Sequence, residues 1–166
     1  MTSPTPTLLD ERLASWLRAN GIPYETHPHQ LTYTALATAH AEGVEPRTFA
    51  KVVAVGTEEG RTTLVVLDAV DAVDLRKVSA LIGGSVRLLT EHELAAACPG
   101  WEAGTVPPVP DLAGAQVVAD EGIRSDERIS FIAGSHTMAV RVDRAAWERA
   151  ARITYGDVAR RPSPPM

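Results

Sequence analysis

Cysteine, lysine and aromatic residues are scarce in this chain of 166 residues. The single cysteine, Cys98, excludes an internal disulfide and a zinc site built on thiolates, and it fits a reducing compartment. Aromatic residues make up 5% of the chain. Only Lys51 and Lys77 accompany the arginines, so each lysine needs a local explanation.

The chain also lacks an excess of positive charge and a long apolar run. Sixteen basic and 21 acidic residues give a net charge of −5, which argues against extended, sequence-independent binding to duplex DNA. No run approaches the roughly 18 consecutive apolar residues of a membrane-spanning helix, and the first residues lack the basic and apolar regions of a secretory signal. We therefore expect a cytoplasmic protein with neither a membrane nor duplex DNA as a partner.

What the chain does contain is material for one packed core, since 45% of its residues are hydrophobic. Residues 1–7 are rich in proline, serine and threonine and are expected to be flexible. Residues 8–155 are expected to form a single domain, and residues 156–166 a proline-bearing tail.

Apolar spacing and capping residues predict helices that alternate with short β-rich segments. The proline- and glycine-rich segment 99–114 predicts one shaped loop without helix or regular strand. Because helices lie between hairpins, the expected class is α+β with a mixed or antiparallel sheet. Helices are expected at 8–19, 35–42, 75–82, 91–97 and 145–151, and strands at 49–55, 62–67, 86–88, 116–119, 129–133 and 138–142.

Lys51 lies within a predicted strand. Alternation along that strand places Lys51 on the same face as Phe49, Val53 and Val55. One interpretation is that its stem extends along apolar neighbours to bring the ammonium to water; the other is a functional ammonium. Lys77 is expected to be solvated on a helix surface.

Two turns could present polar groups to a ligand. In residues 101–108, Gly104 allows close approach of the backbone, while Pro107 and Pro108 would hold a rigid wall with outward carbonyls. A tight surface connection is the alternative. The second turn, Gly134-Ser135-His136, offers a hydroxyl and an imidazole, or simply a solvated histidine.

His27 and His29 have the spacing of a metal pair, but further ligands would have to come from distant residues such as His40, His92 or His136. We therefore expect neither a metal nor a cofactor, and the role of these two histidines stays open. The usual hydrolase, metalloprotease, nucleotide-binding and dinucleotide-binding motifs are absent from the sequence.

A series of short motifs nevertheless gives the chain a family resemblance. The chain resembles the YbaK-like aminoacyl-tRNA deacylases, which are related to the editing domain of bacterial prolyl-tRNA synthetases. The most specific element is the lysine-bearing strand followed by Gly-x-x-x-Pro. The resemblance covers about residues 8–155 and rests on Thr34, Ala50-Lys51-Val52-Val53, Asp74-Leu75-Arg76-Lys77, Arg87-Leu88-Leu89-Thr90-Glu91, Gly104 to Pro108, Asp120 and Ala133-Gly134-Ser135-His136.

The resemblance implies a mixed, partly barrel-like sheet surrounded by helices. It also implies a free-standing enzyme that hydrolyses the ester of a mischarged aminoacyl-tRNA, with Lys51 as the required lysine. The partner would be the 3′ acceptor end of the tRNA, with an aminoacyl-tRNA synthetase as a further candidate. The expected substrate-binding residues are Thr34, Gly104, Thr105, Val106, Pro107, Pro108, Gly134, Ser135 and His136.

Two features leave the substrate open. Val52 follows the lysine where several members of the family have Thr or Asn, and the loop continues as Val109-Pro110. Neither the amino acid, the tRNA nor the oligomeric state follows from the sequence. The alternative function is a non-catalytic module of the same fold that binds aminoacyl-tRNA or another small ligand.

Overall fold

The largest of the three sheets in the described residues has five strands, and it is mixed. The computed structural model describes residues 9–28, 49–132 and 134–160. In this sheet β2 pairs antiparallel with both β5 and β3, whereas β6 runs parallel to both β3 and β9. The strand order is β5 (Val86–Leu88), β2 (Ala50–Thr57), β3 (Thr62–Asp68), β6 (Gln116–Asp120) and β9 (Thr154–Gly156).

The second sheet is antiparallel and has the order β1 (Tyr24–Pro28), β8 (Met138–Asp143) and β7 (Arg128–Ile132). A parallel bridge between Phe49 and Ser130 joins it to the start of β2. The short strands β4 (Ala72–Val73) and β10 (Ala159–Arg160) form a third, two-stranded sheet. The predicted α+β class with a mixed sheet is confirmed.

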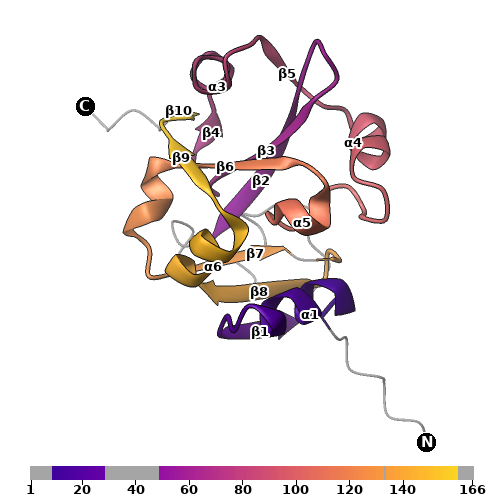
Figure 1. Cartoon of the computed structure of the whole chain (residues 1–166), viewed down its shortest axis with the longest axis vertical. Helices are drawn as coiled ribbons and strands as arrows, with labels where there is room; N and C mark the ends of the chain where they lie inside the picture. Colours follow the sequence, from indigo (N-terminus) through magenta and orange to yellow (C-terminus); the bar gives the residue numbers. More distant parts are fainter. Residues whose placement is uncertain (1–8, 29–48, 133, 161–166) are drawn as a thin grey trace, which may run out of the picture.

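Helices surround the strands (Figure 1). Helix α1 lies beside the three-stranded sheet, while α3 and α4 lie near β5 at the opposite end of the molecule. No helix in the described part of the chain is long and apolar enough to cross a membrane. The helices are α1 (Glu11–Ala19), α3 (Leu75–Ile82), α4 (Glu91–Ala97), α5 (Pro110–Ala113) and α6 (Arg144–Ala151), with a 3₁₀ turn η2 (Glu121–Ser125).

Side-chain caps explain why the predicted helices begin where they do. The Asp74 carboxylate accepts hydrogen bonds from the backbone N–H groups of Arg76 and Lys77 at the start of α3. Thr90 and Glu93 form the predicted capping box at the start of α4. These local bonds satisfy N–H groups that a helix cannot pair itself, so the starts are visible in the sequence.

The structure departs from the predicted elements at several places, and the short strands β4, β9 and β10 were not predicted. Segment 99–114 was expected to lack helix, but Pro110 begins α5, because proline fits the first helical position where its missing N–H is not needed. The polar segment 24–28 forms β1, whose burial pattern is largely exposed. The helix predicted at 35–42 lies outside the described residues, as do residues 1–7.

The hydrophobic core packs against both faces of β2. On one face Ala50 joins the main cluster with Leu13, Leu64 and Trp147, and on the other Val55 joins Leu67 and residues of α3. Burial of a leucine such as Leu64 contributes about 1.5–3 kcal/mol. The alternation predicted for this strand therefore gives it two buried faces.

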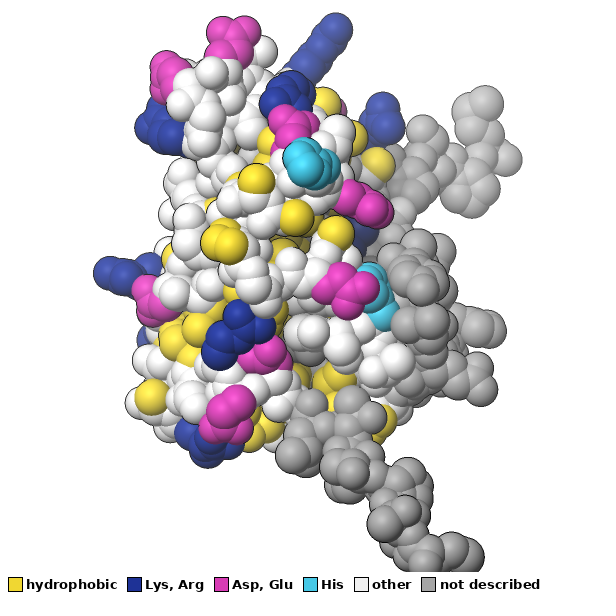
Figure 2. Space-filling view, turned by 90° about the vertical axis from the view of Figure 1, so that its right-hand side faces the viewer, with side chains coloured by type: hydrophobic (Ala, Val, Ile, Leu, Met, Phe, Trp, Pro, Cys, Tyr) yellow, Lys and Arg dark blue, Asp and Glu magenta, His cyan; other side chains and the backbone are white. Residues whose placement is uncertain are grey.

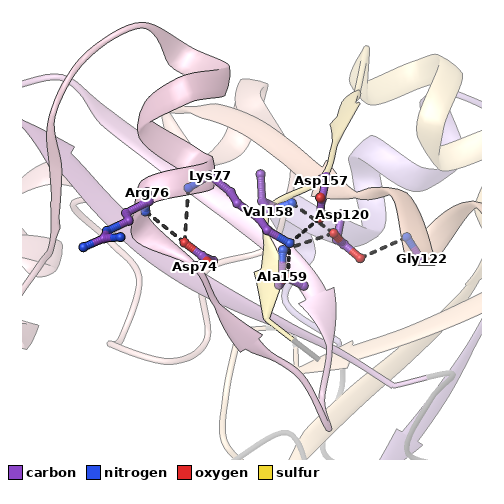
Figure 3. Close-up of polar contacts among 8 residues, drawn as sticks. All are labelled: Asp74, Arg76, Lys77, Asp120, Gly122, Asp157, Val158 and Ala159. Carbon is purple, nitrogen blue, oxygen red and sulfur yellow. Dashed lines mark hydrogen bonds and ion pairs between the residues drawn. The ribbon is translucent and has the colours of Figure 1, made fainter. Parts of the chain in front are cut away.

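A polar network ties the end of the described chain to the larger sheet (Figure 3). The buried Asp120 carboxylate accepts hydrogen bonds from the backbone N–H groups of Val158, Ala159 and Gly122 at 3.0–3.2 Å. Lys77 donates to Asp157 and to the Ala159 carbonyl, both at 3.0 Å. Lys77 therefore links α3 to this segment rather than being solvated alone, and the fold continues beyond the expected boundary at 155.

Candidate functional site

A cleft of about 440 Å³ opens between β2, the connection from β5 to α4, and the turn that precedes Thr105. It lies on the face that carries α4, where hydrophobic side chains gather with acidic side chains beside them (Figure 2). The described lining residues are Val53, Ala54, Leu88, Leu89, Thr90, Glu91, Leu94, Glu102, Ala103, Gly104 and His136.

Gly104 and His136, which lie far apart in the sequence, meet at this cleft. The His136 ring is 6% exposed, and its Nε2–H donates to the Ala103 carbonyl at 3.0 Å. Gly104 has φ +85°, and a Cβ at this position would lie 3.0 Å from His136 Cε1. Both its backbone conformation and the neighbouring ring therefore favour glycine.

The two predicted turns are hydrogen-bonded to each other. The Gly134 N–H donates to the Thr105 carbonyl at 3.0 Å. A Cβ on Gly134 would lie 2.7 Å from Asp10 Cβ, so this turn also packs closely against the start of α1. The Ser135 hydroxyl lies 3.2 Å from that of Thr137 within the same turn.

Arg12 connects α1 to the loop that supplies one wall of the cleft. Its guanidinium donates to the Gly100 carbonyl at 2.9 Å and lies 3.6 Å from the centroid of the Trp101 ring. Asp10 binds the same guanidinium at 2.9 Å. Helix α1 thereby contacts both turns that meet at the cleft.

The remaining loop residues lie in the interior instead of lining the described cleft. Thr105, Val106, Pro107 and Pro108 are all buried. The Pro108 carbonyl accepts a hydrogen bond from the Trp147 indole at 2.9 Å. The prediction that the proline carbonyls face outward is therefore wrong for Pro108. These residues anchor the turn that ends at Gly104.

Lys51 lies on β2, two residues before the cleft-lining Val53 and on the same strand face. It is opposite Leu67 of β3 and is partly buried. Burial lowers its pKa below the ordinary value of 10.5, because desolvation disfavours the ammonium, while the charge of Asp71 acts in the opposite direction.

Asp71 is a buried carboxylate that the sequence alone did not single out. Asp71 is 3% exposed, and its Oδ1 accepts no hydrogen bond within the part of the chain that the structure describes. A turn after β3, closed by a hydrogen bond from the Asp71 N–H to the Asp68 carbonyl, holds it in place. The fold thus supplies a negative charge that favours protonated Lys51.

Other predicted chemical groups do not join this site. Thr34 and His29 lie outside the described residues, and His27 lies 3.3 Å from Glu25. Within residues 9–28, 49–132 and 134–160, no group of three or more His, Cys, Asp or Glu side chains could hold a metal ion. Burial raises the pKa of the Cys98 thiol, which disfavours the nucleophilic thiolate.

Sequence reasoning missed the outer lining of the cleft. Leu88 is 50% exposed, which is unusual for a large apolar residue on a strand, and Glu91 and Glu102 lie at the same cleft. Glu102 lies two residues before Gly104, so its neighbourhood was visible in the loop motif. Leu88 and Glu91 belong to the motif 87–91 that supports the family resemblance, but this motif gave no sign that they line a cleft, since their proximity to Gly104 depends on the tertiary fold.

Comparison with solved structures shows that this fold is shared. One similar structure is a hypothetical protein (TM-score 0.82, 22% identity, covering 90% of this chain and 99% of that one). Another is described as a candidate trans-editing enzyme for prolyl tRNA synthetase (TM-score 0.77, 23% identity, covering 96% and 99%). A third is a candidate signal transduction protein from Marinobacter aquaeolei VT8 (TM-score 0.69, 16% identity, covering 92% and 31%).

Sequence comparison identifies the family directly. No curated protein matches the chain significantly. The family model described as the aminoacyl-tRNA editing domain, however, matches residues 29–150, which include Lys51 and both turns at the cleft. Together with the shared fold, this match shows that the chain belongs to the aminoacyl-tRNA editing domain family.

Proposed function

We propose that this protein is a free-standing aminoacyl-tRNA deacylase of the YbaK-like type, which hydrolyses the ester of mischarged tRNA in trans. The observation that carries the proposal is the partly buried Lys51 on the strand that forms one wall of the cleft. The family match and the similarity to a candidate trans-editing enzyme support it.

The proposed reaction needs little chemical machinery. An aminoacyl ester is already activated, so the site must chiefly position water and stabilise developing charge. Water attacks the carbonyl carbon, the bond to the terminal ribose oxygen breaks, and the products are the free amino acid and the restored ribose hydroxyl. We assign to Lys51 the anchoring of the ribose or terminal phosphate and the stabilisation of negative charge, and not nucleophilic attack.

The turns around Gly104 and His136 would bound the aminoacyl group. Gly104 brings the backbone to the cleft without a side chain, and the buried imidazole of His136 lies directly beside it. Of the expected binding residues in the described chain, these two line the cleft, whereas Thr105, Val106, Pro107, Pro108, Gly134 and Ser135 would act by holding the two turns in place.

The test is deacylation of a panel of tRNAs mischarged with alanine, serine, cysteine and threonine, each in excess over purified protein. The proposal predicts several turnovers per protein molecule for at least one substrate. Binding without turnover would instead support the non-catalytic module. A parallel reaction after exhaustive EDTA treatment should keep its rate, and loss of activity restored by zinc would contradict the metal-free assignment.

A further inference from the structure

The charge of the cleft differs from that expected of a phosphate site. The described lining is mostly apolar, with Val53, Leu88, Leu89 and Leu94, and includes no Lys or Arg. Its two charged side chains from the described chain are both carboxylates, Glu91 and Glu102. Such a lining favours the part of a ligand that carries an apolar group beside a positive charge, whereas a ribose or phosphate would lie with Lys51, which is not among the described lining residues.

These two carboxylates come from different elements. Glu91 is the first residue of α4, and Glu102 belongs to the turn before Gly104. They therefore reach the cleft from separate elements of the fold, α4 and the turn before Gly104. Nearby Glu93, in contrast, is held by Arg87 and by the Thr90 cap, and has its pKa lowered to about 2.

Neither carboxylate has a strong structural role in the described chain. Among residues that the structure describes, Glu91 has no ion pair within 4.0 Å. The Glu102 carboxylate is 67% exposed and lies 3.7 Å from His136 Nε2, which already donates to the Ala103 carbonyl. Both carboxylates can therefore accept hydrogen bonds from a ligand without breaking the fold.

We propose that Glu91 and Glu102 recognise the α-ammonium group of the aminoacyl ester, so that the site takes aminoacyl groups with a free amine and disfavours N-acylated ones. This inference rests on the proposed function, whose substrate carries such an ammonium next to the ester. The apolar lining would receive the side chain, and the two carboxylates would orient the ester relative to β2. Charge thus adds a second selection to the size limit set at Gly104.

The test measures binding, so it does not depend on turnover. Calorimetry compares two non-hydrolysable adenosine ligands, one bearing alanine through a 3′-amide with a free amine, and the other its N-acetyl derivative. The proteins are wild type, Glu91→Gln, Glu102→Gln and the double variant. Glu58→Gln, which removes an exposed carboxylate from the turn between β2 and β3, is the matched control.

Wild type and Glu58→Gln should bind the free amine more tightly than the N-acetyl ligand. Each cleft variant should lose about fivefold in affinity for the free amine, as expected for one partly solvated charge pair, with little change for the N-acetyl ligand. An unchanged preference in the double variant, or equal binding of the two ligands by wild type, would overturn the inference. Amine-dependent binding without hydrolysis of any mischarged tRNA would support the inference while contradicting the proposed deacylase.

Discussion

Lys51 and Lys77 are the two lysines of the chain, and their environments differ. Lys77 donates to Asp157 and to the Ala159 carbonyl. Lys51 makes no hydrogen bond or ion pair within the described chain, and its ammonium is desolvated beside the charge of Asp71. An ammonium that is partly buried, with no such bond to the described residues, costs stability, and such a perturbed group beside a cleft favours a functional role.

This contrast predicts opposite phenotypes for the same substitution. Lys51→Met should keep or raise the melting temperature, because a desolvated charge is removed. It should also lose most deacylation, because the proposed anchoring and charge stabilisation are lost. Lys77→Met should lose up to about 1 kcal/mol of stability, since its partners are partly solvated, and keep its activity per folded molecule. Thermal melting and deacylation rates of both variants check this, and a Lys51→Met variant with full activity would contradict it.

The lowered pKa of Lys51 gives a pH dependence of stability. The folded protein releases this proton at a lower pH than the unfolded chain, whose lysine titrates near 10.5. Between these two pKa values the unfolded chain binds more protons, so the contribution of Lys51 to the free energy of unfolding rises with pH. The stability advantage of Lys51→Met should therefore be present at neutral pH and shrink as the pH approaches 10.5.

Urea unfolding of wild type and Lys51→Met across this pH range measures that difference directly. The titratable groups that both proteins share contribute equally to both free energies of unfolding, so their contributions cancel in the difference. A difference that stays constant with pH, or grows as the pH rises, would contradict desolvation of Lys51.

Gly104 can be tested against a glycine with nearly the same positive φ. Gly104→Ala should cost about 1–2 kcal/mol of stability from the positive φ, and should slow deacylation, more for larger amino acids, because its Cβ meets His136. Gly60, at φ +83°, has no atom within 4 Å of an added Cβ. Gly60→Ala should therefore show the same loss of stability with unchanged deacylation. Identical rate profiles for Gly104→Ala and wild type would remove this turn from the site.

His136→Ala separates the imidazole from the size limit. Loss of the ring removes the hydrogen bond to the Ala103 carbonyl, so deacylation or the preference for polar substrates should change. The order of rates by substrate size should be kept, because the backbone at Gly104 remains. The same panel of mischarged tRNAs measures both effects, and a variant that accepts larger amino acids would show that the imidazole itself sets the limit.

At the scale of elements, α1 holds the loop that bears Gly104. Arg12 contacts the Gly100 carbonyl and the Trp101 ring, whereas Arg18, on the same helix, pairs with Glu11. Arg12→Gln should therefore speed hydrogen exchange at the Thr105 amide and lower kcat/KM severalfold, while Arg18→Gln should change neither. Unchanged exchange at this amide in Arg12→Gln would show that the loop is held by its own buried residues.

The elements differ in how well the sequence predicts them, and the reason is local. Helix α3 and helix α4 carry their own caps at Asp74 and Thr90, so their starts were predicted correctly. Strand β1 is mostly exposed and lacks apolar alternation, and β10 pairs with β4 far away in the sequence. Such strands form because of partners that no local pattern reveals.

The candidate site shows the same division. The turns at Gly104 and His136 were recognised through motifs, and Lys51 through its unusual position in an apolar strand. Asp71 was missed, and Glu91 was noted only within the motif 87–91 and not as a site residue, because their positions arise from burial and from the meeting of β2, α4 and the loop. Which charged side chains line a cleft depends on the whole fold, whereas a glycine turn or a lysine in an apolar strand can be recognised from the neighbouring sequence.

At the scale of the whole molecule, the cleft exists because two sheets and α1 hold separate chain segments together. The Phe49–Ser130 bridge joins the sheets, and a hydrogen bond from Gly134 to Thr105 joins the two turns. The Asp120 network (Figure 3) lies at the β6–β9 edge of the larger sheet, whereas the cleft lies toward the β5–β2 edge. The fold therefore separates residues that maintain the sheet from those proposed to act on the substrate.

The most direct test of the central claim is the initial rate of ester hydrolysis with mischarged tRNA in excess, for wild type and for Lys51→Met shown to be folded by its melting curve. The account predicts repeated turnover by wild type and a loss of about a hundredfold or more in the variant, as for removal of one group that stabilises charge in a transition state. Equal rates for the two proteins at equal folded concentration would contradict the role of Lys51.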